Sequence, residues 1–282
     1  MQISGLDHVV ILCGDYEGAI QTYSTLLGRS VDWRYASPDD GTATALFVLE
    51  NTAIELLAPY GDGPMGDRIK ELLGDRPGHL SSLVFRTHDI DAAHHTATRR
   101  GLAPDALVTM QAQYEGLTRQ WTRFRCKDDA MAGLKVFMCQ QVKGELPVFP
   151  GRDGDVFRLD HLVVNTTNPD RAMACYGAKL GLRLALDRTN TDWGSRFLFF
   201  RLPDLTFEVV RRLDSGAPET APDTLWGLTW QVRDLDAARD RMIAAGVDVS
   251  EVRKGRKPGT RVMSVRSHDL GVPTLFLEQE RN

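Results

Sequence analysis

The sequence has few cysteines, no long apolar run and no excess of basic residues, and each of these absences excludes a class of protein. Its 282 residues include only four cysteines, which lie far apart, so neither a disulfide framework nor a Cys-x-x-Cys metal site is expected. No run approaches the roughly 18 apolar residues that a membrane span needs. Residues 1–7 lack the basic and then apolar pattern of a signal peptide. Basic residues number 34 against 38 acidic ones, so no nucleic-acid partner is expected.

These absences leave a soluble globular protein of one or two domains. Hydrophobic residues make up 42% of the chain and charged residues 26%, which is typical of a globular protein and excludes a disordered or fibrous one. The length allows one large or two ordinary domains. We expect a cytoplasmic protein with reduced, mostly buried thiols.

The most informative feature present is an internal repeat. Residues 6–10 read Leu-Asp-His-Val-Val and residues 159–163 read Leu-Asp-His-Leu-Val, an offset of 153 (161 − 8). At the same offset, with no gap, three further pairs of residues are identical: Tyr23 and Tyr176, Gly28 and Gly181, and Glu55 and Glu208. Each copy therefore separates its histidine from its glutamate by 47 residues (55 − 8 and 208 − 161).

A second pair of stretches repeats with a different offset. Residues 89–93 resemble residues 234–238, an offset of 145 (234 − 89). The chain thus divides into four modules in the order A, B, A′ and B′, which we place at residues 1–62, 78–145, 157–214 and 224–282. Proline, glycine and polar residues gather at 144–155, the expected link between the two halves.

Each module has the same local pattern, an apolar strand, a helix and three further strands. In module A, apolar residues at three- and four-residue spacing predict a helix over 15–28 that ends at a glycine. Alternating and apolar runs predict the strands and the other helices. They are strands at 30–35, 44–49, 53–57, 117–126, 135–140, 261–265 and 274–278, and helices at 91–100 and 236–245.

The chain has four β-α-β-β-β modules, and two of them, A and A′, open with Leu-Asp-His and carry a glutamate near the module end. In this it resembles the vicinal oxygen chelate superfamily. That superfamily includes glyoxalase I, extradiol dioxygenases, methylmalonyl-CoA epimerase and the bleomycin resistance proteins. The resemblance implies an α+β fold in which modules pair to form cupped, half-barrel sheets. It also implies two glyoxalase-like domains, at residues 1–145 and 157–282.

The resemblance further implies metal ligands on the first and last strands of a module. In this sequence they are His8, Glu55, His161 and Glu208, with the two glutamates also moving protons. Imidazole and carboxylate donors suit Fe, Mn, Ni, Zn or Co as the divalent ion. The implied function is a metal-dependent lyase or isomerase, or a ring-cleaving dioxygenase, acting on a small molecule with vicinal oxygens. The alternative is a metal-free binding protein of the bleomycin-resistance type.

Modules B and B′ depart from the complete ligand pattern. The positions that match His8 are Ser82 and Gly227, and those that match Glu55 are Phe137 and roughly Phe276. Three arrangements stay open: module A on A′ around one four-ligand site, A with B and A′ with B′ as two incomplete sites, or a partner chain that completes the site. The protein is accordingly a monomer or a homodimer.

A second candidate feature is an alternation of cations and an aromatic residue. Arg119, Trp121, Arg123 and Arg125 occupy every second position of one expected strand and so share a face. If that face lines the cavity, Trp121 and Arg123, together with Ser82 and Phe137, would bind the substrate. The alternative is an exposed polar face of the sheet.

Overall fold

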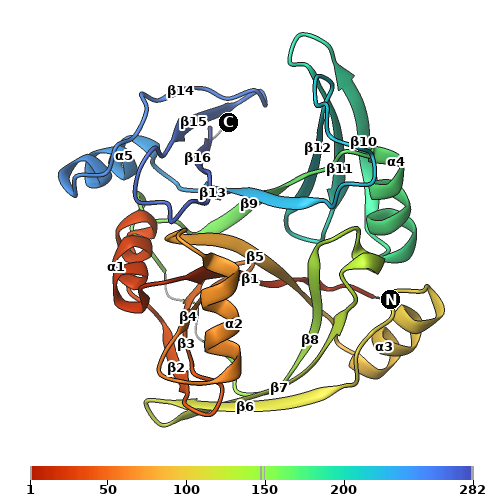
Figure 1. The fold of residues 1–282 in the computed structure, drawn as a ribbon. Helices are drawn as coiled ribbons and strands as arrows, with labels where there is room; N and C mark the ends of the chain where they lie inside the picture. The colour runs from red at the N-terminus through yellow and green to blue at the C-terminus, as the bar shows by residue number, and fades with distance from the viewer. Residues whose placement is uncertain (1, 147, 149, 281–282) are drawn as a thin grey trace. The chain divides into compact units, whose positions relative to one another are not determined.

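The computed structural model describes residues 2–146, 148 and 150–280 of the chain. It contains two eight-stranded mixed sheets, one in each half of the sequence (Figure 1). The first half contributes β1 (Gly5–Cys13), β2 (Trp33–Ser37), β3 (Thr42–Val48), β4 (Ala53–Pro59), β5 (Gly78–Arg86), β6 (Val108–Tyr114), β7 (Leu117–Cys126) and β8 (Lys135–Lys143). The second contributes β9 (Arg158–Asn165), β10 (Arg183–Asn190), β11 (Ser195–Arg201), β12 (Thr206–Arg212), β13 (Thr224–Gln231), β14 (Arg253–Lys254), β15 (Thr260–Ser264) and β16 (Thr274–Gln279).

The two sheets have the same strand order. The first runs β2-β3-β4-β1-β5-β8-β7-β6 and the second β10-β11-β12-β9-β13-β16-β15-β14. Within a module the last three strands form an antiparallel meander, and the last strand pairs in parallel with the first, as β12 does with β9 and β8 with β5. The predicted α+β fold of four β-α-β-β-β modules is confirmed, with modules A and B in one sheet and A′ and B′ in the other.

Local sequence explains three of the helices. They are α1 (Tyr16–Leu27), α3 (Ile90–Arg99) and α5 (Leu235–Ala244), and each begins after an aspartate whose side chain accepts a hydrogen bond from a backbone N–H in the first turn. Asp15, Asp89 and Asp234 are these caps. Helix α1 ends at Gly28, whose φ of 72° is the left-handed conformation that glycine adopts without a steric penalty.

Two helical features differ from the sequence prediction. Helix α2 (Pro64–Leu73) follows module A, where the sequence indicated only a boundary. A proline in its first turn and the buried Ile69 and Leu73 account for it. In module A′ the expected helix is a short α4 (Pro169–Ala172) that continues as a π-helical segment, η2 (Met173–Lys179). A 3₁₀ turn, η1 (Asp129–Met131), precedes β8.

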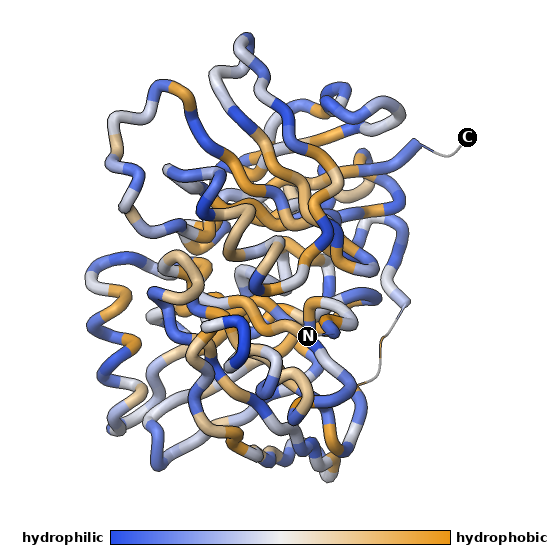
Figure 2. Tube along the Cα trace, turned by 90° about the vertical axis from the view of Figure 1, so that its right-hand side faces the viewer, coloured by the Kyte–Doolittle hydropathy of each residue, from blue (hydrophilic) through white to orange (hydrophobic). Residues whose placement is uncertain are grey.

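The core lies along the strands and the inner faces of the helices. Figure 2 shows hydrophobic residues running along the strands and hydrophilic residues along most of the connecting loops. All four cysteines are buried. Burial raises the pKa of the Cys13 thiol to about 12 and that of Cys175 to about 11, so neither is a thiolate near neutral pH. None of the described helices has the length and apolar character to span a membrane.

Contacts between Cα atoms divide the chain into two compact units that cut across the sequence order. One unit contains Met1–Val9, Ser81–Glu145 and His161–Trp226, and therefore most of modules B and A′. The other contains Val10–Leu80, Leu146–Asp160 and Gly227–Asn282, and therefore most of modules A and B′. The predicted domain boundaries at 145 and 157 stay a prediction.

Candidate active site

His161 and Glu208 face each other across two neighbouring parallel strands. Glu208 on β12 is paired with Val163 on β9, and His161 lies two residues before Val163, so both side chains point to the same face of the sheet. Nε2 of His161 is 3.5 Å from Oε2 of Glu208, and the side chains are 20% and 15% exposed. This separation is longer than a good hydrogen bond.

His8 in the first half is oriented by the carboxylate beside it. Its Nδ1 lies 2.8 Å from Oδ1 of Asp7, and Oδ2 of Asp7 lies 3.4 Å from Nε of Arg86. Burial raises the pKa of the Asp7 carboxyl. The hydrogen bond and charge of His8, with the charges of Arg86 and Arg119, lower it by more, so the pKa lies below its usual value. Because an ionised carboxylate only accepts hydrogen bonds, Nδ1 of His8 carries the proton and Nε2 is the nitrogen suited to a ligand.

The remaining predicted ligand is in the other compact unit. Glu55 lies on β4, half-buried and opposite Leu46 of β3. Across the described residues, no three histidine, cysteine, aspartate or glutamate side chains gather closely enough to hold a metal ion. The structure therefore brings His161 and Glu208 together, and the four-ligand set with His8 and Glu55 stays a prediction.

The strand register tests which residues stand at the other ligand positions. In β5 and β8, Val84 is paired with Phe137, just as Val163 is paired with Glu208 in module A′. Phe137 therefore occupies the position of Glu208, as the sequence predicted. Ser82 lies two residues before Val84 and shares the face of Phe137, in the place of a ligand histidine.

In module B′ the same comparison corrects the sequence register by one residue. Thr229, two residues after Gly227, is paired with Leu275, so Leu275 and not Phe276 stands at the glutamate position. Phe276 is fully buried. Gly227 has a structural explanation, because a Cβ there would lie 2.6 Å from the carbonyl oxygen of Pro273. Module B′ thus supplies neither a histidine nor a carboxylate at these two positions.

The alternating residues of β7 share one face, as predicted. Arg119, Trp121, Arg123 and Arg125 are all half-buried, whereas Phe124 and Cys126 on the opposite face are buried. The ring of Phe124 contacts that of His94 on α3, so the helix covers the other face. The guanidinium carbons of Arg123 and Arg125 lie 5.2 and 5.9 Å from the centre of the Phe137 ring. The structure therefore assembles Phe137 with these arginines, and a substrate-binding role stays a prediction.

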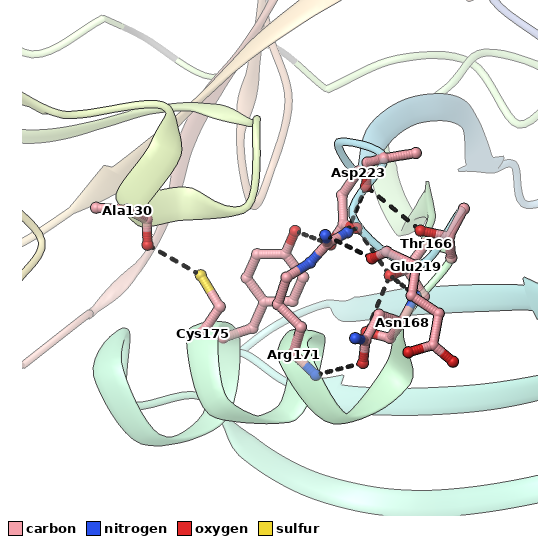
Figure 3. A network of polar contacts seen from close by, with 10 residues as sticks. Ala130, Thr166, Asn168, Arg171, Cys175, Glu219 and Asp223 are labelled. Carbon is pink, nitrogen blue, oxygen red and sulfur yellow. Dashed lines mark hydrogen bonds and ion pairs between the residues drawn. The ribbon is translucent and has the colours of Figure 1, made fainter. Parts of the chain in front are cut away.

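A buried polar network was not predicted from the sequence (Figure 3). The carboxylate of Asp223 has no exposed surface and accepts hydrogen bonds from Thr166 Oγ1 at 2.7 Å, Arg171 Nη2 at 2.6 Å and Tyr176 Oη at 2.6 Å. Burial, and next the negative charge of Asp223, raise the pKa of the Tyr176 hydroxyl well above its usual value. Tyr176 is fully buried and belongs to the core. The carboxylate, the two hydroxyls and Nη2 of Arg171 are all paired within the chain, so the network is structural.

One glycine pattern has a structural rather than a ligand-binding cause. Residues 61–66 have the spacing Gly-x-Gly-x-x-Gly at the start of α2. A Cβ on Gly63 would lie 2.4 Å from the backbone of Asp40, and one on Gly66 would lie 2.2 Å from the carbonyl oxygen of Gly41. The turn between β2 and β3 therefore covers this helix start, and the glycines permit that close approach.

Two family models match the chain. The model described as "Glyoxalase-like domain" matches residues 6–152, and "Glyoxalase/Bleomycin resistance protein/Dioxygenase superfamily" matches residues 160–263. Among curated proteins, the ethylmalonyl-CoA/methylmalonyl-CoA epimerase of Cereibacter sphaeroides is 34% identical over 100 residues, which are 35% of this chain and 72% of that protein. The mitochondrial methylmalonyl-CoA epimerase of Homo sapiens is 30% identical over 89 residues, which are 31% of this chain and 49% of that protein.

Solved structures match the whole fold. A mutant 4-hydroxymandelate synthase from Streptomyces coelicolor is similar with a TM-score of 0.70 and 13% identity, over 100% of this chain and 94% of that one. A Mn(II)-bound glyoxalase from Novosphingobium aromaticivorans is similar with a TM-score of 0.66 and 13% identity, over 99% and 83% of the two chains. At this identity the likeness concerns the fold alone. With the two family models covering most of its length, the chain belongs to the glyoxalase/bleomycin resistance protein/dioxygenase superfamily.

Proposed function

We propose that the chain is a metal-dependent isomerase or lyase that removes a proton next to a carbonyl group of a small molecule. The observation that supports this most directly is the His161–Glu208 pair, a half-buried imidazole and carboxylate 3.5 Å apart on one sheet face. The curated relatives are named as epimerases of ethylmalonyl-CoA and methylmalonyl-CoA. A coenzyme A thioester is therefore the substrate class we propose.

The His161–Glu208 geometry is compatible with a divalent ion. Two ligands at about 2.1 Å from one ion, separated by about 90–110°, lie about 3.0–3.4 Å apart, close to the observed distance. We propose His8, Glu55, His161 and Glu208 as the metal ligands, with water and substrate oxygens completing the shell. Such a donor set accepts Fe, Mn, Ni, Zn or Co. When bound, the ion would polarise the substrate carbonyl and make the neighbouring C–H bond more acidic.

The chain's own residues would move the proton. Glu208 is placed to accept it, because its carboxylate lies on the half-exposed face where His161 is also directed. In the proposed epimerisation, Glu55 returns a proton to the opposite side of the same carbon. A ring-cleaving oxygenase is less well supported, because its two-histidine triad needs a second histidine in the same sheet, and Ser82 and Gly227 stand at the corresponding positions.

Metal content and proton exchange test the proposal together. Protein purified without chelator should hold about one tightly bound divalent ion per chain, and it should exchange the α-proton of methylmalonyl-CoA in D₂O, followed by NMR. His161→Ala and His8→Ala should each remove the ion if the four ligands share it, and Glu208→Gln should abolish exchange. The exposed His95, changed to Ala, is the matched control and should alter neither readout. Wild-type protein that binds none of Ni(II), Zn(II), Mn(II) or Fe(II) would overturn the proposal.

One observation favours a second candidate, a metal-free binding protein. Phe137 and Leu275 replace carboxylates at two ligand positions, and the Phe137 ring already packs against two arginines. For this candidate we expect no metal and no exchange, but stoichiometric binding of an aromatic compound that survives treatment with a chelator.

A further inference from the structure

The face of β7 and β8 that includes Ser82 of β5 carries an unusual concentration of cations. We use the name cationic face for Arg119, Trp121, Arg123, Arg125 and Phe137. Arg119 lies 5.7 Å from the centre of the Trp121 ring, and both Arg123 and Arg125 lie over Phe137. All five side chains are half-buried, so water screens their charges less than it would on an exposed surface. Such a face favours an anion.

The members of the cationic face differ in whether their charge is matched. Both carboxylate oxygens of Asp128 bind Nη2 of Arg125, at 2.6 and 2.7 Å. Arg119 donates to the side-chain oxygen of Gln141 at 3.3 Å. Within the described part of the chain, the guanidinium of Arg123 has neither a hydrogen-bond acceptor nor a carboxylate, and its contact is the Phe137 ring. A half-buried guanidinium without an acceptor is unfavourable unless something else supplies one.

The second half shows that this face is not a general requirement of the fold. Arg123 is paired with Cys139, two residues after Phe137, and Val262 is paired with Leu277, two residues after Leu275. Val262 is therefore the counterpart of Arg123 in the second sheet. By the same register Ser264 is the counterpart of Arg125. The second sheet is therefore built with no arginine at either position, so the fold itself does not require Arg123 or Arg125.

We infer that Arg123 binds a carboxylate of the ligand, and that the acyl part of the proposed substrate is an organic acid whose apolar or planar portion packs beside Trp121 and Phe137. The guanidinium of Arg123 lies 5.2 Å from the centre of the Phe137 ring, and its planar fork of N–H groups suits two-point binding of a carboxylate. Asp7, which is anionic and paired with Arg86 on β5, belongs to the same compact unit and would repel a second negative group placed near it. This inference rests on the proposed function for the idea that the face lines the substrate site, but its test requires no catalysis.

Binding of a simple acid in the presence of a chelator tests the inference. The probes are benzoate and benzamide, which have the same ring but differ in charge, and the measurement is isothermal calorimetry on the full chain with EDTA. Benzoate should bind at least about tenfold more tightly than benzamide. Arg123→Gln should weaken benzoate binding about tenfold or more and leave benzamide unchanged. Arg123→Lys should restore part of the affinity, because it keeps the charge and loses the planar fork.

Controls separate this inference from a folding defect and from the proposed function. Arg188→Gln, at an exposed strand arginine in the second half, should leave benzoate binding unchanged. The melting temperature of Arg123→Gln should stay close to that of the wild type, because the arginine loses only its contact with the Phe137 ring and no hydrogen bond or ion pair. Equal binding of benzoate and benzamide, no benzoate binding, or an Arg123→Gln variant that binds like the wild type would overturn it. Benzoate binding without metal or proton exchange would reject the proposed function alone.

Discussion

Modules A and A′ share a fold and a repeat, yet among the described residues the buried network around Asp223 has no counterpart in module A. The four positions of that network correspond at the repeat offsets to residues that cannot form it. Thr166, Arg171, Tyr176 and Asp223 in the second half are matched by Cys13, Gly18, Tyr23 and Gly78 in the first. Of the four, only the tyrosine is kept. The hydroxyl of Tyr23 is buried and has no hydrogen-bond partner among the described residues, whereas that of Tyr176 donates to Asp223.

This difference shows that the residues of the buried network depend on one another, because the first half lacks the carboxylate, the threonine and the arginine together. A Cβ at Gly78 would lie 2.7 Å from the carbonyl oxygen of Leu12, so the first half has no room for a carboxylate there. An arginine at position 18 would therefore have no counterpart of the Asp223 carboxylate to bind. The first half therefore tolerates one unsatisfied hydroxyl, whereas the second uses a charge to fasten residues 219–223 to the start of its helix.

The largest effect is expected from removal of the carboxylate at the centre of the network. Asp223→Ala leaves the hydroxyls of Thr166 and Tyr176 and the half-buried Arg171 without their shared acceptor, so it should lower the free energy of unfolding by about 3–5 kcal/mol. Urea unfolding followed by circular dichroism measures this. The exposed Asp214, changed to Ala, should leave the free energy of unfolding unchanged. A loss of less than about 1 kcal/mol in the free energy of unfolding of Asp223→Ala would show that the network contributes little to the stability of the second half.

The two tyrosines give a direct test of the same comparison. Tyr176→Phe removes a donor from a buried carboxylate and should lower the free energy of unfolding by about 1–3 kcal/mol. Tyr23→Phe removes a hydroxyl that has no partner, so it should be neutral or stabilising. The measurement is the difference between the two variants under identical conditions. Equal losses at both positions would contradict the assignment of the hydrogen bond to one half.

A smaller, pH-dependent effect on stability is expected from Asp7, the carboxylate that is hydrogen-bonded to His8 in the first half. The folded-state pKa of Asp7 is lowered, so its contribution to stability is present above the ordinary aspartate pKa and is lost as the pH falls through the lowered value. Asp7→Asn should therefore lower the free energy of unfolding by about 1–2 kcal/mol at pH 7 and by less near pH 2. Thermal unfolding between pH 2 and pH 7 measures it. A loss that stays constant over this range would show that the charge of Asp7 is not involved.

Sequence reasoning recovered most of the fold because its signals are local. The caps and apolar spacing of α1, α3 and α5 lie within each segment, and strand β7 has the bounds predicted for it. Strand β6 was missed although Val108, Met110, Ala112 and Tyr114 alternate with polar residues, and only Ala112 in this strand is buried. The register of β16 was wrong by one residue because Pro273 shifts the strand relative to the repeat, and only strand pairing reveals this.

The candidate site was less accessible, because its determining contacts are not local. The repeat identified His161 and Glu208, and the structure brings them together. Nothing in the sequence indicated that Asp7 would bind both His8 and Arg86, which are 1 and 79 positions away (8 − 7 and 86 − 7). The matching of Arg125 and the unmatched Arg123 likewise depend on side-chain geometry and not on spacing.

The C-terminal end of α1 has a consequence for any attempt to cut the chain in two. Its last carbonyl groups, those of Thr25 and Leu26, accept hydrogen bonds from the guanidinium of Arg241 on α5, and the side chain of Asn51 binds the backbone of Leu159 in both directions. A fragment that ends near residue 145 would keep all eight strands of its sheet but lose the guanidinium that binds the last carbonyl groups of its first helix. The halves of this protein are therefore better regarded as co-dependent fragments, to be produced together and reassembled, than as modules to be transplanted singly.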